Sequence, residues 1–268
     1  MAGGAAPYSP CTPDVTVVIP LFNQGHFLED AIRSVVAASS GGPAIADAVA
    51  GPVVARPVVA GPVVDVIVVD DHSTDDSGEV AAGLLEAMPW LPLAVISRAA
   101  NGGLGAARNT GFGAARGRYV FALDADNLLY PSGLRVLHQH LDAAPIEVAA
   151  AYGILERFDE TGALGLTSHL PWDPDLLVHG AFIDAMALWR KTAWEAIGGY
   201  TADDQIYGWE DYDLWLALAE RGERADLVTR IVGRYREQPG SMRKISDIDM
   251  EANFVRLRER HPRLPWPS

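Results

Sequence analysis

Three of the chain's close pairs of acidic residues are candidates for chemistry. Asp70-Asp71 and Asp124-Ala-Asp126 each follow an apolar run, and Glu210-Asp211 precedes an apolar helical segment. Carboxylates two residues apart can share a hard cation such as Mg²⁺ or Mn²⁺, which keeps waters and takes phosphate oxygens. Each pair also has an ordinary interpretation, because aspartates favour turns and acids favour the first turn of a helix.

A second group of residues can meet an anion or a flat ring. Asn101-Gly-Gly-Leu-Gly105 opens an expected helix, where free backbone N–H groups can face an anion, although a plain turn has the same composition. Arg98 and Arg108 are able to meet a diphosphate or to form ion pairs at the edge of the core. Phe22 offers an aromatic face to a nucleobase. Together with the acidic pairs, these residues have the composition of a nucleotide site.

The elements that must position these residues alternate between strands and helices. Apolar and β-branched runs predict strands at 15–19, 63–69, 93–96 and 119–123, and helical spacing predicts helices at 26–38, 77–87, 104–115 and 131–143. The order predicts an α/β fold with a mostly parallel, Rossmann-like sheet flanked by helices. Ligands bind beyond the carboxyl ends of such strands, so we expect Phe22, Asp71, Arg98 and Asp124 at one rim.

The second half of the chain is less regular. Strands are predicted at 148–158 and 227–235, and helices at 191–197, 211–221 and 248–260. A Pro-Val-Val unit repeats every five residues within 51–64, and its prolines predict an extended surface insertion. No change of composition marks a linker, so we expect a single domain.

Composition and charge exclude several classes of protein. The 268 residues include 21 Lys+Arg and 35 Asp+Glu, a net charge of −14, which argues against nucleic acid or anionic lipid as a partner. The single Cys11 suits a reducing compartment. No run reaches the roughly 18 apolar residues of a membrane span. Residues 1–13 have a loose composition without secretory features, so we expect a flexible tail and a cytoplasmic protein.

Motifs of other enzyme classes are absent from the sequence. The first strand runs into Pro20-Leu-Phe-Asn-Gln-Gly25, which lacks the Gly-x-Gly-x-x-Gly spacing of a dinucleotide site. There is no Gly-x-x-x-x-Gly-Lys-Ser/Thr loop, no His-Glu-x-x-His and no Gly-x-Ser-x-Gly elbow.

Six stretches in order give the chain a resemblance to the family 2 inverting glycosyltransferases, which have the GT-A fold. The stretches are Val17-Val-Ile-Pro-Leu-Phe-Asn23, Val68-Val-Asp-Asp-His-Ser-Thr-Asp-Asp-Ser77, Asn101-Gly-Gly-Leu-Gly-Ala-Ala-Arg-Asn109, Leu123-Asp-Ala-Asp126, Gly198-Gly-Tyr200 and Trp209-Glu-Asp-Tyr-Asp-Leu-Trp215. The resemblance covers roughly residues 13–241. It implies transfer of one sugar from a nucleoside-diphosphate-sugar, with UDP-sugars favoured, to an acceptor hydroxyl.

The resemblance also implies a role for each matching residue. Phe22 would stack on the nucleobase, Asp71 would hydrogen-bond it, and Asp124 would touch the ribose. Asp126 would hold Mn²⁺ or Mg²⁺ at the diphosphate, and within Glu210-Asp211 the aspartate would be the catalytic base. The other expected donor-binding residues are Pro20, Asn23, Arg98, Asn101, Gly102 and Arg108. The expected single domain spans 14–262, with a nucleotide-sugar half at 14–127, an acceptor and catalytic half at 128–245 and a C-terminal helix at 246–262.

The acceptor side is less well defined. Trp209 is a candidate stacking face for an acceptor, and Gln238 stands where the family often has a histidine, which leaves its part in metal binding open. His179 and Asp184 precede an apolar segment, and the sequence does not decide whether they line this side. The acceptor is an unknown hydroxyl of a sugar, a lipid-linked sugar or a small molecule. Two alternatives stay open: a sugar nucleotidyltransferase and a catalytically silent nucleotide-sugar-binding module.

Overall fold

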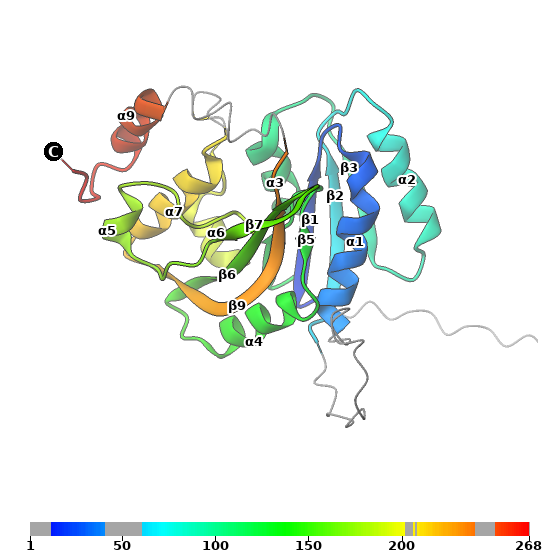
Figure 1. Cartoon of the computed structure of the whole chain (residues 1–268), viewed down its shortest axis with the longest axis horizontal. Helices are drawn as coiled ribbons and strands as arrows, with labels where there is room; N and C mark the ends of the chain where they lie inside the picture. The colour runs from blue at the N-terminus through cyan, green and yellow to red at the C-terminus, as the bar shows by residue number, and fades with distance from the viewer. Residues whose placement is uncertain (1–11, 41–60, 202–205, 207, 239–249, 268) are drawn as a thin grey trace, which may run out of the picture.

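The first half of the chain forms four parallel strands connected by helices. The computed structural model describes residues 12–40, 61–201, 206, 208–238 and 250–267 (Figure 1). Its first elements are β1 (Val15–Leu21), α1 (Gly25–Ser40), β2 (Val64–Asp70), α2 (Ser77–Ala87), β3 (Leu93–Ser97), α3 (Gly103–Ala114) and β4 (Tyr119–Ala122). β1 pairs in parallel with β2 and β4, and β2 pairs in parallel with β3. The predicted α/β order is therefore confirmed.

The second half extends the same sheet with mixed pairing. It consists of β5 (Leu128–Leu129), α4 (Gly133–Ala143), β6 (Val148–Asp159), β7 (Gly162–Thr167), α5 (Pro174–Leu177), β8 (Ala187–Arg190), α6 (Lys191–Ile197), α7 (Glu210–Glu220), β9 (Arg224–Arg236) and α9 (Met250–Arg260). The strand order is β3-β2-β1-β4-β8-β6-β9-β5, with β7 paired to β6. β8 is antiparallel to both neighbours, whereas β6 and β9 are parallel. Figure 1 shows the long strand β9 curving under this half.

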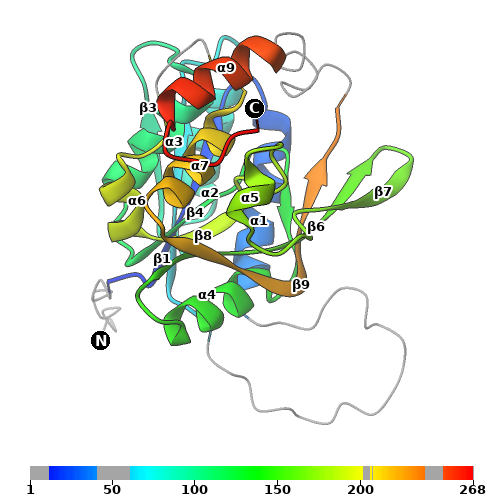
Figure 2. The same ribbon diagram turned by 90° about the vertical axis from the view of Figure 1, so that its left-hand side faces the viewer.

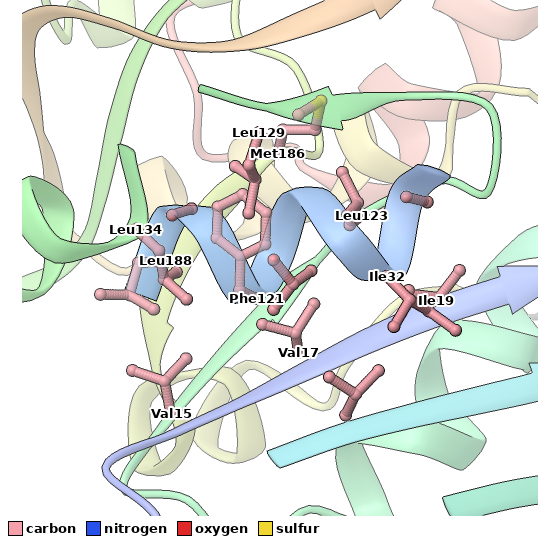
Figure 3. Packing of buried hydrophobic residues seen from close by; sticks show 14 of the residues in the cluster. Val15, Val17, Ile19, Ile32, Phe121, Leu123, Leu129, Leu134, Met186 and Leu188 are labelled. Carbon is pink, nitrogen blue, oxygen red and sulfur yellow. The ribbon is translucent and has the colours of Figure 1, made fainter. Parts of the chain in front are cut away.

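Helices cover both faces of the sheet. Residues of α1, α2 and α4 share one buried cluster with the odd-numbered side chains of β1, and residues of α3, α6, α7 and α9 share the cluster on the opposite face. Figure 3 shows Val17, Ile19, Ile32 and Phe121 meeting between the sheet and α1. In Figure 2, α9 lies beside α7 on the outside of the second layer. Because both faces are covered, every residue of β1 is buried and the strand reads as a continuous apolar run.

Several elements differ from the predicted ones. The prediction that Pro20 ends the first strand is wrong: β1 continues to Leu21 and Pro20 lies opposite Val69 of β2. Proline has no N–H to donate toward β4, and the pairing with β4 ends earlier, at Val18 and Ala122. The elements β5, β7, β8 and α5 were not predicted. Most of the predicted tail and of the Pro-Val-Val insertion, and the start of the C-terminal helix, lie outside the described residues.

None of the helices in the described ranges has the length and apolar character needed to cross a membrane.

Candidate active site

The parallel register brings the predicted polar residues to one rim. Leu21 of β1 lies opposite Asp70 of β2, and Asp70 lies opposite Ser97 of β3. The residues that follow these strands, including Phe22, Asp71 and Arg98, are therefore neighbours at the carboxyl ends. This is the edge at which open α/β sheets bind ligands.

The carboxylate of Asp71 occupies the N-terminus of α3. It accepts hydrogen bonds from the N–H groups of Gly102 at 3.2 Å and Gly103 at 2.8 Å, and it forms an ion pair with Arg98. The side chain of Asn101 donates to the Asp71 carbonyl at 3.1 Å. The anion at the glycine-rich turn is thus a side chain of the protein. A Cβ at Gly102 would lie 2.5 Å from an Nη atom of Arg98, so only glycine fits beside this ion pair without a shift.

The loop after β1 presents an aromatic ring at the rim. Phe22 exposes 44% of its surface. The next residue, Asn23, has a φ of 55°, and its side-chain oxygen accepts a hydrogen bond from the backbone N–H of Thr74 at 2.8 Å. Its own N–H donates to Ser73 Oγ at 3.1 Å. These bonds tie the loop after β1 to the loop after β2 and leave the Phe22 ring accessible to a ligand.

Arg108 of α3 forms the buried centre of the site. Its guanidinium donates to Asp124 Oδ1 at 2.7 Å, with 3% of the Arg108 side chain exposed, and it lies 5.3 Å from the centre of the Tyr200 ring. Burial lowers the pKa of Arg108, but the charges of Asp124, Tyr200 and Asp211 outweigh burial and hold the pKa above its ordinary value. Arg108 therefore stays charged. It forms an ion pair with Asp124, which follows β4, and is electrostatically coupled to Asp211 in the first turn of α7.

Asp126 lies beside the end of β9. Gln238 donates to Asp126 Oδ2 at 2.7 Å, and the Nε of Arg236 donates to the Asp126 carbonyl at 2.9 Å. Burial and the charge of Asp124 raise the pKa of Asp126 to about 6, against the hydrogen bond from Gln238. Gln238, whose part in metal binding the sequence left open, thus contacts the candidate metal ligand Asp126 through its amide.

The acids of this region fit an open divalent-cation site. No group of three or more His, Cys, Asp or Glu residues forms a metal cage within the part of the chain that the structure describes. Mg²⁺ and Mn²⁺ are commonly held by one or two carboxylates, with waters and substrate phosphates completing the shell. Asp126, with one oxygen bound by Gln238, can supply such a ligand.

Asp211 lies in the first turn of α7. Its Oδ1 accepts a hydrogen bond from the N–H of Tyr212 at 2.8 Å. Burial raises the pKa of Asp211, Arg108 lowers it and Glu210 raises it again, to about 6. The neighbouring Glu210 is buried against α3, where a Cβ on Gly105 would lie 3.2 Å from Glu210 Cγ. A carboxylate with this pKa is ionised at neutral pH and can still accept a proton.

The C-terminal segment holds α7 from its outer side. Buried Asp213 accepts bonds from Arg260 Nε at 2.7 Å and contacts His261 Nε2 at 2.8 Å. The ring of Trp209 lies edge-to-face with Phe254 of α9, with ring centres 5.2 Å apart. Part of the Trp209 ring therefore packs against α9. Its role as a stacking face for the acceptor stays a prediction.

Comparison with known proteins agrees with this arrangement. Residues 16–206 match the model of the glycosyl transferase family 2. The chain belongs to this family. The family match includes the ends of β1, β2 and β4.

Individual family members cover only parts of the chain. The succinoglycan biosynthesis protein ExoO of Rhizobium meliloti is 34% identical over 137 residues, which are 51% of this chain and 32% of ExoO. This family 2 chain spans 16% to 55% of the length of the curated relatives it matches.

Solved glycosyltransferases share the fold. TarS of S. aureus in complex with UDP has a TM-score of 0.64 at 15% identity, covering 91% of this chain and 65% of TarS. The mannosyltransferase PcManGT of Pyrobaculum calidifontis, in complex with GDP-Man and Mn²⁺, has a TM-score of 0.64 at 19% identity, covering 95% and 66%. At these identities the likeness establishes the fold, which is GT-A.

Two residues that contact the site received no role in the sequence analysis. Tyr200 lies against Arg108, and Asn109 holds the Tyr200 backbone with bonds of 2.8 and 2.9 Å. Arg236 binds the backbone of the Asp126 segment and stacks on Phe27 with its guanidinium 4.5 Å from the ring centre. Tyr200 belongs to the stretch Gly198-Gly-Tyr200 that resembles the family, and Arg236 stands two residues before Gln238. Their positions in or near residues that the sequence analysis had singled out were the one sequence feature that could have pointed to them.

Proposed function

We propose that this glycosyltransferase moves one sugar from a nucleoside-diphosphate-sugar, with a UDP-sugar favoured, to an acceptor hydroxyl with inversion at the anomeric carbon. Asp211 is the general base and Asp126 is the protein ligand of a divalent cation. In the same proposal, residues 14–127 bind the donor, residues 128–245 carry the acceptor side and the base, and the C-terminal segment 246–262, which contains α9, supports them.

The observation that carries the proposal is the buried Arg108. It pairs with Asp124 on the donor side at 2.7 Å and is electrostatically coupled to Asp211 on α7. A donor acid and a candidate base therefore share one fixed positive charge, although they are 87 positions apart in the sequence. Such preorganised charges are what sugar transfer requires on the two sides of the reacting carbon.

Asp211 can accept the proton that the acceptor hydroxyl loses during transfer. With a pKa of about 6, Asp211 is ionised at neutral pH and accepts the proton of the attacking hydroxyl as that hydroxyl bonds to the anomeric carbon. The bond from that carbon to the diphosphate oxygen breaks in the same step, so no sugar–enzyme bond forms and the configuration inverts. A divalent cation at Asp126, when bound, would carry negative charge of the departing diphosphate.

The donor assignment is supported by the rim and by the structural neighbours. Phe22 is exposed where a base can stack, next to the loop that carries Asp71. Crystal structures of TarS are in complex with UDP or UDP-GlcNAc, and the PcManGT structure is in complex with GDP-Man and Mn²⁺. We favour a UDP-sugar, and GDP-sugars are the alternative that an experiment must separate.

Thermal unfolding of the full chain with UDP, GDP and dTDP, each with and without Mn²⁺, tests the donor and the cation. The preferred nucleotide at about 100 times its dissociation constant should add roughly 2.7 kcal/mol of stability, and only with Mn²⁺. Release of the diphosphate from the matching sugar nucleotides then tests catalysis. Asp211→Asn should abolish turnover and keep nucleotide binding, whereas Asp175→Asn, at an exposed acid of α5, should change neither. Equal turnover by Asp211→Asn would refute the base.

A further inference from the structure

A third carboxyl group, that of Asp184, is held close to the two acids already described. Asp184 precedes β8, and its backbone N–H donates to Ser168 Oγ at 2.7 Å. Its Oδ1 accepts a hydrogen bond from the N–H of Met186 at 2.9 Å. Among the described residues no hydrogen bond reaches Oδ2, and the residue is only partly buried. The carboxyl group is thus fixed through one oxygen while the other remains available to a ligand.

The pairing of β8 places Asp184 beside the donor side, because β8 runs antiparallel to β4 with Leu188 opposite Phe121, so the residues that precede β8 lie next to the end of β4 that leads to Asp124. Its electrostatic partners are Asp124, Asp211 and Arg108, so three carboxyl groups share one guanidinium. Burial, then Asp124 and Asp211, raise the pKa of Asp184 to about 7. The donor sugar must lie between the diphosphate and the base during transfer. A carboxyl group that lies next to the end of β4 and is electrostatically coupled to Asp211 is therefore well placed to contact that sugar.

We propose that Asp184 binds a hydroxyl group of the transferred sugar through Oδ2 and thereby determines which sugar is accepted. This inference rests on the proposed function. A carboxylate accepts a short, strong hydrogen bond from a hydroxyl group, and its direction is fixed here by Ser168 and Met186. A site built to bond one hydroxyl discriminates against a sugar whose hydroxyl points elsewhere, because its polar group is then left unpaired.

The proposal separates binding of the sugar from binding of the nucleotide. Calorimetric titrations compare UDP with UDP-glucose, UDP-galactose and UDP-GlcNAc, and GDP with GDP-mannose, all with Mn²⁺, on the wild type, Asp184→Asn and Asp175→Asn. We expect Asp184→Asn to bind the free diphosphate within twofold of the wild type, to bind the preferred sugar nucleotide at least tenfold more weakly, and to lose most of the preference between sugars. Asp175→Asn, at an exposed acid nine residues earlier, should match the wild type throughout.

Three results would overturn the proposal. Unchanged affinity of Asp184→Asn for every sugar nucleotide would exclude contact with the donor sugar. An equal loss for the free diphosphate and its sugar nucleotide would show a general effect on the nucleotide site. A wild type that binds no nucleotide diphosphate would remove the proposed function itself, and this proposal with it. Thermal unfolding checks that the variant folds, and the Asn carbonyl can still accept the Met186 N–H, so its melting temperature at pH 8 should not fall.

Discussion

Two aspartates on the same helix should respond to neutralisation with opposite signs. Asp211 and Asp213 are both in the first turn of α7, but burial raises the pKa of Asp211 to about 6, whereas hydrogen bonds from His261 and Arg260 overcome burial and lower the pKa of Asp213. Ionisation of Asp211 therefore lowers the stability of the folded state, whereas ionisation of Asp213 raises it. Replacing each by asparagine keeps its shape and removes its charge, which isolates this difference.

The expected size for Asp211 follows from its pKa. The unfolded chain releases this proton near 3.8 and the folded chain only near 6, so wild-type stability falls as pH rises between these values. At about 1.36 kcal/mol per pH unit the loss is about 0.6 kcal/mol at pH 4 and at most about 3 kcal/mol at pH 8. Asp211→Asn avoids this loss, which corresponds to a melting temperature higher by up to roughly 6–12 °C at pH 8. Its transfer rate should nevertheless fall by at least about 100-fold.

Asp213→Asn is the matched control. Because the folded-state pKa of Asp213 is lowered, its stabilising contribution is present above the unfolded value and is lost as pH falls through the folded one. Weakening the bonds from Arg260 and His261 should cost about 1.5–3 kcal/mol at pH 8 and less in acid. Urea unfolding of the wild type and both variants at pH 4, 6 and 8 measures the two trends. If both variants lose stability to the same extent at pH 8, burial does not raise the Asp211 pKa and the poised base is refuted.

Three further predictions concern activity and binding. The value of kcat/KM should rise roughly tenfold between pH 5 and pH 7 as Asp211, with a pKa of about 6, ionises; initial rates at low donor concentration measure this, and a flat profile would contradict it. Phe22→Ala should weaken binding of the nucleotide at least about fivefold, because base stacking is lost, while the melting temperature stays the same because the ring is exposed; unchanged affinity in a titration would exclude stacking. Gln238→Ala removes a bond that lowers the Asp126 pKa, so the midpoint of Mn²⁺-dependent nucleotide binding should move to higher pH, and an unmoved midpoint would show that this bond does not act on the metal ligand.

The fold was largely predictable where elements are determined locally. The predicted helices at 77–87 and 191–197 have the observed bounds of α2 and α6, because their apolar spacing and their ends lie within the segment itself. The strand β8 was missed: it has four residues, and its position between β4 and β6 depends on partners about 40 to 70 residues away. Similarly, β1 continues past Pro20 because its edge facing β2 remains paired, with Pro20 opposite Val69 and Leu21 opposite Asp70.

The site was predictable as a set of residues and not as a set of contacts. Asp71 and Gly102 were assigned separate roles because 31 positions separate them, and only the folded chain shows that the carboxylate of one occupies the N–H groups of the other. The coupling of Asp184 to Asp124 and Asp211 depends in the same way on how β8 packs between two strands of the sheet. Residue types predict which chemistry a rim can perform, whereas pKa values depend on burial and neighbours that no local pattern records.

The net charge of −14 is reflected at this rim, where carboxylates outnumber the arginines that could meet a diphosphate. Arg98 is paired with Asp71 and Arg108 with Asp124, so both arginines expected to meet a diphosphate already have carboxylate partners. Burial is the main cause of the raised pKa of Asp126, Asp184 and Asp211, and neighbouring carboxylates raise each pKa further. A diphosphate entering this cluster adds further negative charge. Unless those ion pairs open, we expect a divalent cation bound together with the diphosphate to supply positive charge that Arg98 and Arg108 do not.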